Sequence, residues 1–221
     1  MTGISREPTG PASSPAGSRW SARAAFRSVR RWLSLATAAG AAACGGRSAS
    51  AARDVAPTGV RVVPLAAAIV LETAGPPPAD TAVSFTAGRP RTIVLRHGPP
   101  ENVVFAEVTF GAAAFRADSG QPVEVELRPR PGVYGLELRS SVPLAGGATI
   151  VFRYPRYFLA PARGRAVYGS DVLYERALAV GLLGGTGQTL SLLPTTRPAP
   201  DNLQAAVRAP GTYLVAAPET P

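Results

Sequence analysis

The 221-residue chain contains no lysine, and it has only one cysteine, one histidine and one methionine. A lone cysteine excludes an internal disulfide. The lone histidine, His97, has no cysteine or carboxylate at metal-ligand spacing, so we predict no metal site and no cofactor. All 23 basic residues are arginines, set against 14 acidic residues. This bias is typical of GC-rich codon usage, and we assign no chemistry to the choice of arginine.

Long hydrophobic segments are also scarce near the N-terminus. The uncharged run Trp32 to Ala43 is too short for a bilayer span, which needs about 20 apolar residues. Residues 1–18 are rich in Gly, Pro, Ser and Thr and are predicted to be disordered. Between these two segments lie five arginines, at positions 19, 23, 27, 30 and 31. A short apolar core after a basic stretch predicts a signal-peptide helix, so residues 1–43 form the predicted leader.

The small residues Ala41, Ala42 and Ala43 precede Cys44 at the end of this leader, as signal peptidases require. The segment resembles the leader of a bacterial lipoprotein, whose cysteine carries a diacylglycerol and becomes the mature N-terminus. The resemblance implies lipidation of Cys44, a flexible tether over residues 44–58, and a location in the bacterial cell envelope. Gly45 after the cysteine favours the outer membrane, with the protein facing the periplasm or the exterior.

Residues 29–33 (Val-Arg-Arg-Trp-Leu) also resemble a twin-arginine export signal. The sequence therefore leaves open whether export uses the general or the twin-arginine route.

From residue 59 to 221, short β-favouring runs alternate with Gly, Pro, Asp and Asn. The clearest run is 122–129, in which Val123, Val125 and Leu127 alternate with polar residues. Strands are predicted at 69–71, 81–86, 91–97, 102–110, 122–129, 132–140, 148–155, 176–183, 188–194, 203–208 and 212–216. Residues 160–175 are less periodic and leave room for a turn of helix. This spacing predicts an all-β domain, an antiparallel β-sandwich.

The order of turns and strands over residues 110–218 resembles a β-sandwich domain shared by zona occludens proteins, netrin receptors and ankyrins. The segments that carry it are 111–115 (GAAAF), 142–144 (VPL), 150–155 (IVFRYP), 178–180 (LAV), 184–187 (GGTG), 190–194 (LSLLP), 203–207 (LQAAV) and 211–217 (GTYLVAA). In that family the domain is a scaffold or interaction module without catalytic residues. The resemblance thus implies a non-enzymatic role.

The segment FRYPRYF interleaves arginine with aromatic residues and provides a candidate binding surface. Its members are Arg153, Tyr154, Arg156 and Tyr157. Such a mixture suits single-stranded nucleic acid, because bases stack on rings while arginine contacts phosphate. It equally suits a strand with a solvated arginine face. An exported chain meets little nucleic acid, so we expect an envelope protein or polymer as partner and no nucleic acid.

Other motifs favour structural roles. His97 ends a strand before Gly-Pro-Pro and is predicted to be a solvated turn residue. The glycine-rich segment 181–189 lacks the lysine of a phosphate-binding loop, and its residues 184–187 predict a hairpin turn. Ser170-Asp171 has no histidine to complete a catalytic triad.

The acidic residues on the central strands are predicted to form charge pairs across strands rather than a glycosidase pair. The residues concerned are Glu124, Glu126 and Glu137, with Arg128, Arg130 and Arg139 beside them.

Three functions follow from the sequence. The first is an exported, lipid-anchored, non-catalytic β-sandwich with a structural or binding role. The second is a secreted accessory or hydrolytic domain that acts on polysaccharide. The third is a cytoplasmic basic nucleic-acid-binding protein that retains its leader: residues 1–43 carry six arginines and one acid, a net +5 of the chain's +9. The oligomeric state is left open.

Overall fold

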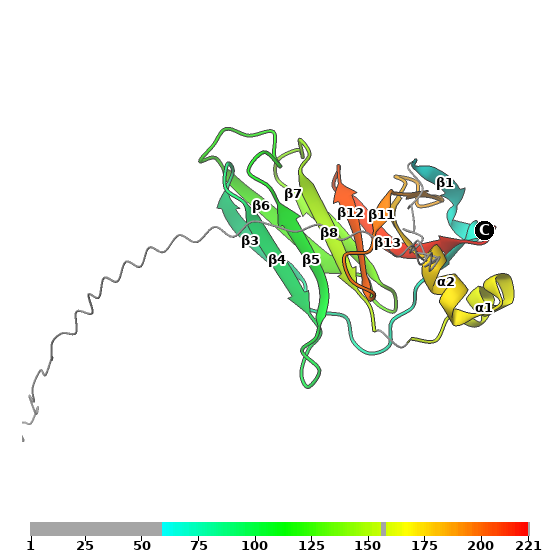
Figure 1. Cartoon of the computed structure of the whole chain (residues 1–221). Helices are drawn as coiled ribbons and strands as arrows, with labels where there is room; N and C mark the ends of the chain where they lie inside the picture. Colours follow the sequence, from blue (N-terminus) through cyan, green and yellow to red (C-terminus); the bar gives the residue numbers. More distant parts are fainter. Residues whose placement is uncertain (1–58, 156–157, 221) are drawn as a thin grey trace, which may run out of the picture. The chain divides into compact units, whose positions relative to one another are not determined.

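A computed structural model describes residues 59–155 and 158–220 (Figure 1). Two antiparallel β-sheets and few helices make up this region, so the prediction of an all-β, two-sheet fold is confirmed. The predicted leader, the cleavage region Ala41–Ala43 and Cys44 lie outside the described residues. Arg156 and Tyr157 of the candidate binding surface also lie outside them.

The larger sheet has eight strands. In spatial order they are β1 (Arg61–Pro64), β10 (Thr189–Leu192), β9 (Ala179–Leu183), β13 (Gly211–Pro218), β7 (Gly135–Ser140), β6 (Pro122–Pro129) and β3 (Thr81–Thr86), while β2 (Ala68–Val70) pairs with β13 off this path. Strand β13 lies in the middle of the sheet and pairs with β9, β7 and β2.

The smaller sheet has five strands. Their order is β11 (Thr195–Thr196), β12 (Asn202–Val207), β8 (Ala148–Arg153), β5 (Val104–Phe110) and β4 (Arg91–Arg96). Helical segments are η1 (Leu65–Ala67), α1 (Ala162–Tyr168) and α2 (Asp171–Ala177).

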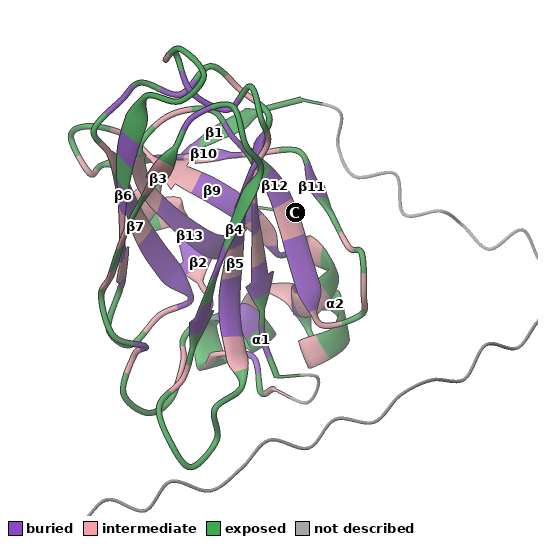
Figure 2. Cartoon of the chain, turned by 90° about the vertical axis from the view of Figure 1, so that its left-hand side faces the viewer, coloured by how far each residue is buried: buried purple, intermediate pink, exposed green. Residues whose placement is uncertain are grey.

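Strands β3 and β6 have the predicted bounds, and they pair with each other in the larger sheet. On β6, Val123, Val125 and Leu127 are buried, as their alternation predicts. The core lies between the two sheets, and Figure 2 shows its buried residues along the central strands. Its largest fully buried side chains include Phe105, Phe110 and Phe152 of the smaller sheet. Each such side chain stabilises the fold by about 1.5–3 kcal/mol.

The segment 160–175 forms two helices rather than a single turn. Helix α1 ends at Gly169, whose positive φ of 76° provides a left-handed C-cap. Ser170 is the N-cap of helix α2, and its Oγ accepts a hydrogen bond from the Leu173 N–H at 3.2 Å. Because α2 runs to Ala177, the strand predicted from residue 176 begins only at Ala179.

The predicted hairpin at 184–187 is confirmed, because it joins β9 to the antiparallel β10. The Gly184 N–H donates to the Thr189 carbonyl at 2.8 Å, which closes the turn. Gly187 has a φ of +72°, a conformation that favours glycine.

Several connections meet at one end of the two sheets. Because β4, β5, β8 and β12 are antiparallel neighbours, the ends of β4 and β8 lie beside the starts of β5 and β12. The loop between β4 and β5 and the segment after β2 run along the lower side of Figure 1. This loop end forms the candidate site.

Candidate functional site

A groove of about 900 Å³ opens at the loop end, between the ends of the two sheets. Five parts of the chain line it. Three come from the larger sheet and the β4–β5 loop: 71–74 after β2, 96–97 with 101–104 around the loop, and Tyr134 before β7. The other two are the end of β8 with the segment after it (153–155, Phe158 and Leu159) and Asp201 before β12.

Tyr134 and His97 line the groove, and both rings pack on the buried ring of Phe105. The rings of Phe105, on β5, and Tyr134, just before β7, stack with centroids 5.4 Å apart and an interplanar angle of 13°. His97 meets Phe105 edge-on at 5.3 Å. Burial, above all, raises the pKa of the Tyr134 phenol; the nearby Glu101 carboxylate also raises it, and a hydrogen bond with Thr73 opposes the rise. His97 lies just after β4 as predicted, but its ring is half-buried against Phe105 rather than fully solvated.

Tyr154 lines the groove and bonds to helix α2 and to the segment before β12. Its ring is buried, and its hydroxyl lies 2.8 Å from Glu175 Oε1 and 2.9 Å from the Pro200 carbonyl, the two acceptors of its proton. The same oxygen accepts a hydrogen bond from Arg197 Nη1 at 2.7 Å. Burial chiefly, and then the bond to Glu175, raises the pKa of the Tyr154 phenol well above its usual range. The phenol is thus a neutral, anchored group and not a free stacking platform.

Arg153 also lines the groove, and its guanidinium donates to Glu107 Oε1 at 2.6 Å. The structure therefore brings Arg153 and Tyr154 of the predicted binding surface to one wall. A binding role for this surface stays a prediction, and its other two members lie outside the described residues.

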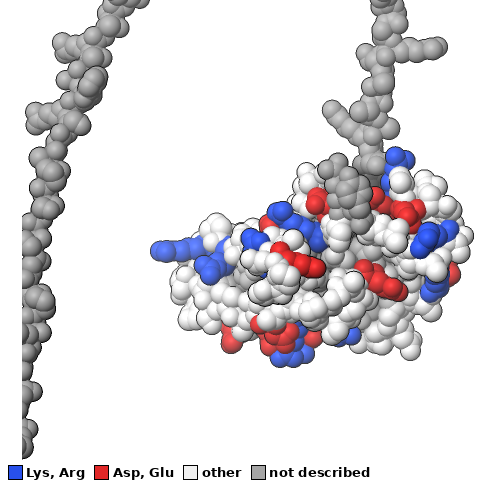
Figure 3. All heavy atoms as spheres, turned by 90° about the horizontal axis from the view of Figure 1, so that it is seen from below, with Lys and Arg blue, Asp and Glu red and all other residues white. Residues whose placement is uncertain are grey.

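Three carboxylates line the groove without an ion-pair partner among residues 59–155 and 158–220: Glu72, Glu101 and Asp201. Two apolar side chains, Val103 and Leu159, also line it and are 53% and 76% exposed. Unpaired carboxylates beside exposed apolar groups suit a partner with hydrogen-bond donors or cations next to an apolar part. Figure 3 views the described region from this side, where acidic and basic side chains are interspersed.

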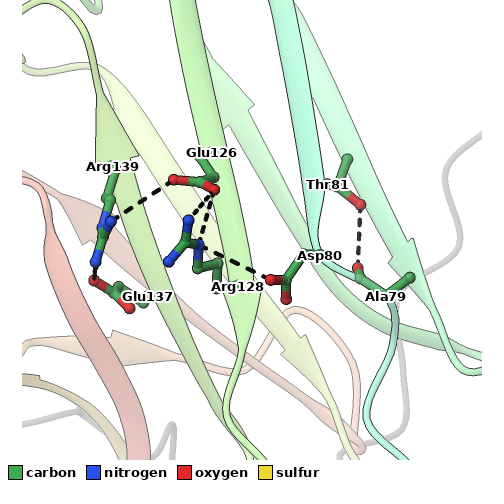
Figure 4. Close-up of polar contacts among 7 residues, drawn as sticks. All are labelled: Ala79, Asp80, Thr81, Glu126, Arg128, Glu137 and Arg139. Atoms are coloured by element: carbon green, nitrogen blue, oxygen red, sulfur yellow. Dashed lines mark hydrogen bonds and ion pairs between the residues drawn. The ribbon is translucent and has the colours of Figure 1, made fainter.

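The acidic residues of the central strands lie away from the groove, on β6 and β7 of the larger sheet (Figure 4). Arg128 pairs with Glu126 at a Nε–Oε1 distance of 2.8 Å, and Arg139 pairs with Glu137 at 2.7 Å. These pairs join residues two apart on one strand, which share a face. The predicted cross-strand pairing is limited to a 3.9 Å contact between Arg139 and Glu126, and Arg128 also lies 3.9 Å from Asp80.

Within the described ranges, none of the helices has the length and apolarity of a membrane span. Residues 59–155 and 158–220 also contain no group of three or more His, Cys, Asp or Glu side chains placed to hold a metal ion.

Nothing in the local sequence marks Glu72, Glu101 and Asp201 as neighbours in one groove. They come from three connections that are far apart in the chain and meet only because the strands between them are antiparallel. The local signal that could have pointed to the groove is the Gly-Pro-Pro segment after His97, because proline-rich connections mark loops at strand ends.

No protein-family model, curated protein or solved structure matches the chain.

Proposed function

We propose that this chain is an exported, lipid-anchored, non-catalytic β-sandwich that binds an envelope protein or polymer through the groove at its loop end. The observation that carries the proposal is the groove itself, in which the rings of Tyr134 and His97, three carboxylates and two exposed apolar side chains line one hollow of about 900 Å³. A binding surface needs this combination of shape, apolar contact and polar specificity.

The leader supports the anchor. Ala41, Ala42 and Ala43 before Cys44 provide the cleavage region and the lipid attachment site of the lipoprotein resemblance. An anchor at Cys44 leaves residues 44–58 as the link, which spans at most about 50 Å when fully extended. The groove would then sample envelope components within a few nanometres of the membrane. The resemblance of residues 110–218 to an interaction module points to the same role.

Mass spectrometry of the native protein tests the anchor. We expect an N-terminus at a diacylated Cys44, and we expect a Cys44→Ser chain to leave the membrane fraction. A native chain that begins at Met1 with an unmodified thiol would refute export and would favour the nucleic-acid-binding alternative.

Co-sedimentation with isolated peptidoglycan sacculi and with membrane vesicles of the same envelope tests the groove. Leu159→Ser removes an apolar side chain from the groove, whereas Val172→Ser removes an exposed apolar side chain, 56% exposed, that does not line it. We expect the first variant to weaken binding at least severalfold and the second to bind like the unaltered chain. Equal binding by both variants would show that the groove is not the site.

The three groove carboxylates favour one alternative, a domain that hydrolyses polysaccharide. Glycosidases place two carboxyl groups on either side of a cleft. Release of reducing sugar from envelope polysaccharide, lost on Glu72→Gln or Glu101→Gln, would replace the non-catalytic proposal.

A further inference from the structure

Strand β3 is an open edge of the larger sheet without the usual protection. Edge strands are commonly blunted by charge, proline, a bulge or short length. Strand β1 has only four residues, including an arginine and a proline; β4 has two arginines and a register shift; β11 has two residues. Strand β3, by contrast, is the six-residue run TAVSFT, which has no charge, no proline and no register shift against β6.

Hydrogen bonding on β6 shows which backbone groups of β3 face the open side. Successive residues of an antiparallel strand direct their N–H and C=O groups to opposite neighbours. The Ser141 N–H donates to the Glu124 carbonyl at 2.9 Å on the β7 side, so the β6 residues next to Glu124 bond β3. Those β6 residues, Val123 and Val125, lie opposite Phe85 and Val83, so the odd-numbered residues of β3 bond to β6. The same alternation continues past the strand, where the Ala87 N–H donates to the Gln121 carbonyl at 2.9 Å.

The backbone groups of Ala82, Ser84 and Thr86 therefore point to the open side. Among residues 59–155 and 158–220, no hydrogen bond outside the sheet satisfies them.

The inward side chains of β3 are incompletely covered. Thr81, Val83 and Phe85 are only half-buried, although their neighbours on β6 are almost fully buried. The Phe85 ring packs on Phe110 and Phe115, with centroids 5.9 Å and 5.7 Å away, yet it stays partly exposed. A strand added beside β3 would cover this apolar surface.

We propose that β3 pairs with β3 of a second copy of this chain, antiparallel and centred on Ser84. In this register Ser84 faces Ser84 of the second copy, and Ala82 faces Thr86, which gives about six main-chain hydrogen bonds. On the inward face Val83 lies beside Phe85 of the second copy, a β-branched and aromatic pair of the kind that stabilises sheets. The contact is a two-fold, self-complementary interface that extends the larger sheet across two molecules.

The absence of charge makes a second copy the fitting occupant. Like charges directly opposite each other destabilise a strand pair, and β3 brings none to its own copy. Strand β4 of the other sheet brings Arg91 and Arg96, which oppose the same pairing in that layer. The contact is confined to one layer, so the dimer is concentration-dependent rather than obligate.

Sedimentation velocity of the full chain carrying Cys44→Ser tests the proposal, because this substitution removes any disulfide-linked dimer. Ser84→Pro deletes an outward N–H at an edge position where proline is tolerated in the monomer. Ser84→Ala keeps that N–H and is the matched control. Val94→Pro, at an outward position of the β4 edge, controls for proline at another edge. We expect self-association in the unaltered, Ser84→Ala and Val94→Pro chains, and at least tenfold weaker association in Ser84→Pro.

Association of Ser84→Pro as tight as that of Ser84→Ala, or a monomeric unaltered chain over two decades of concentration, would overturn the proposal. Should Ser84→Pro fail to fold by circular dichroism, amide exchange of the unaltered chain decides. Exchange at Ala82, Ser84 and Thr86 is expected to slow as concentration rises, and concentration-independent exchange would refute the pairing.

Discussion

Raising the pH is expected to unfold the β domain through its tyrosines. Five phenols have a raised pKa, and burial is the largest cause for each: Tyr134, Tyr154, Tyr168, Tyr174 and Tyr213. The sixth, Tyr157, lies outside the described residues. Because the chain has no lysine and guanidinium groups stay protonated, tyrosine is the side chain that ionises above pH 10.

The sign of the effect follows from proton binding. Above pH 10 the unfolded chain releases its phenolic protons, while the native state retains them up to its higher pKa values. The unfolded state then binds fewer protons, so stability falls as pH rises above about 10 and is unaffected by these groups below it. Each buried phenol lowers the free energy of unfolding by about 1.4 kcal/mol for every pH unit between its unfolded and its native pKa.

Four of the tyrosines are at most 4% exposed: Tyr134, Tyr154, Tyr174 and Tyr213. Two of them, Tyr154 and Tyr174, have a pKa raised far above the usual range, and together they lower the free energy of unfolding by about 3 kcal/mol at pH 11 and about 5 kcal/mol at pH 12. Domains of this size have a total stability of about 5–15 kcal/mol. The raised pKa values of the other three tyrosines add to this loss, so we expect cooperative unfolding near pH 12.

Tyrosinate absorbance and far-ultraviolet circular dichroism, followed through the same alkaline titration, check this prediction. The two signals should change together, and the chain unfolded in urea should titrate near pH 10 as the reference. Reversible ionisation of all six phenols near pH 10 with an unchanged dichroism spectrum would refute the reasoning.

Four substitutions test these contacts by urea denaturation. Tyr154→Phe removes a hydroxyl that bonds to Glu175, to the Pro200 carbonyl and to Arg197, and two of these partners are charged. The substitution should lower the free energy of unfolding by about 2 kcal/mol, and a loss under about 0.5 kcal/mol would contradict the anchoring role. Gly181→Ala places a Cβ 2.7 Å from Leu190 Cγ and should cost about 1–3 kcal/mol, whereas Gly185→Ala, with open space around its Cβ, should change stability by less than about 0.5 kcal/mol. Glu126→Gln should cost less than about 1 kcal/mol, because its ion pairs lie at the surface, and a larger loss would show that they are desolvated.

The sequence predicted those strands and turns whose conformation depends on neighbouring residues alone. The alternation of apolar and polar residues in 122–129 marks both the strand and its buried face. The glycines of 184–187 mark a tight turn, because the positive φ of Gly187 is a conformation that favours glycine. Strands β1 and β11 were not predicted, since they are short and form only through pairing with β10 and β12.

The candidate site was predictable only in part, because it depends on which loops meet. Arg153 and Tyr154 stand out locally as an alternation of arginine and aromatic residues, and both do line the groove. Burial of Tyr154 could not be foreseen, since it depends on Glu175 and Arg197, which the chain brings in from α2 and from the segment after β11.

The central position of β13 has a consequence for biosynthesis. It is the last strand of the described region to leave the ribosome, yet β7, β9 and β2 all pair with it. Until residues 211–218 have emerged, the two halves of the larger sheet have no strand to join them. The larger sheet can therefore be completed only at the end of the synthesis of this region, when its central strand becomes available to both halves.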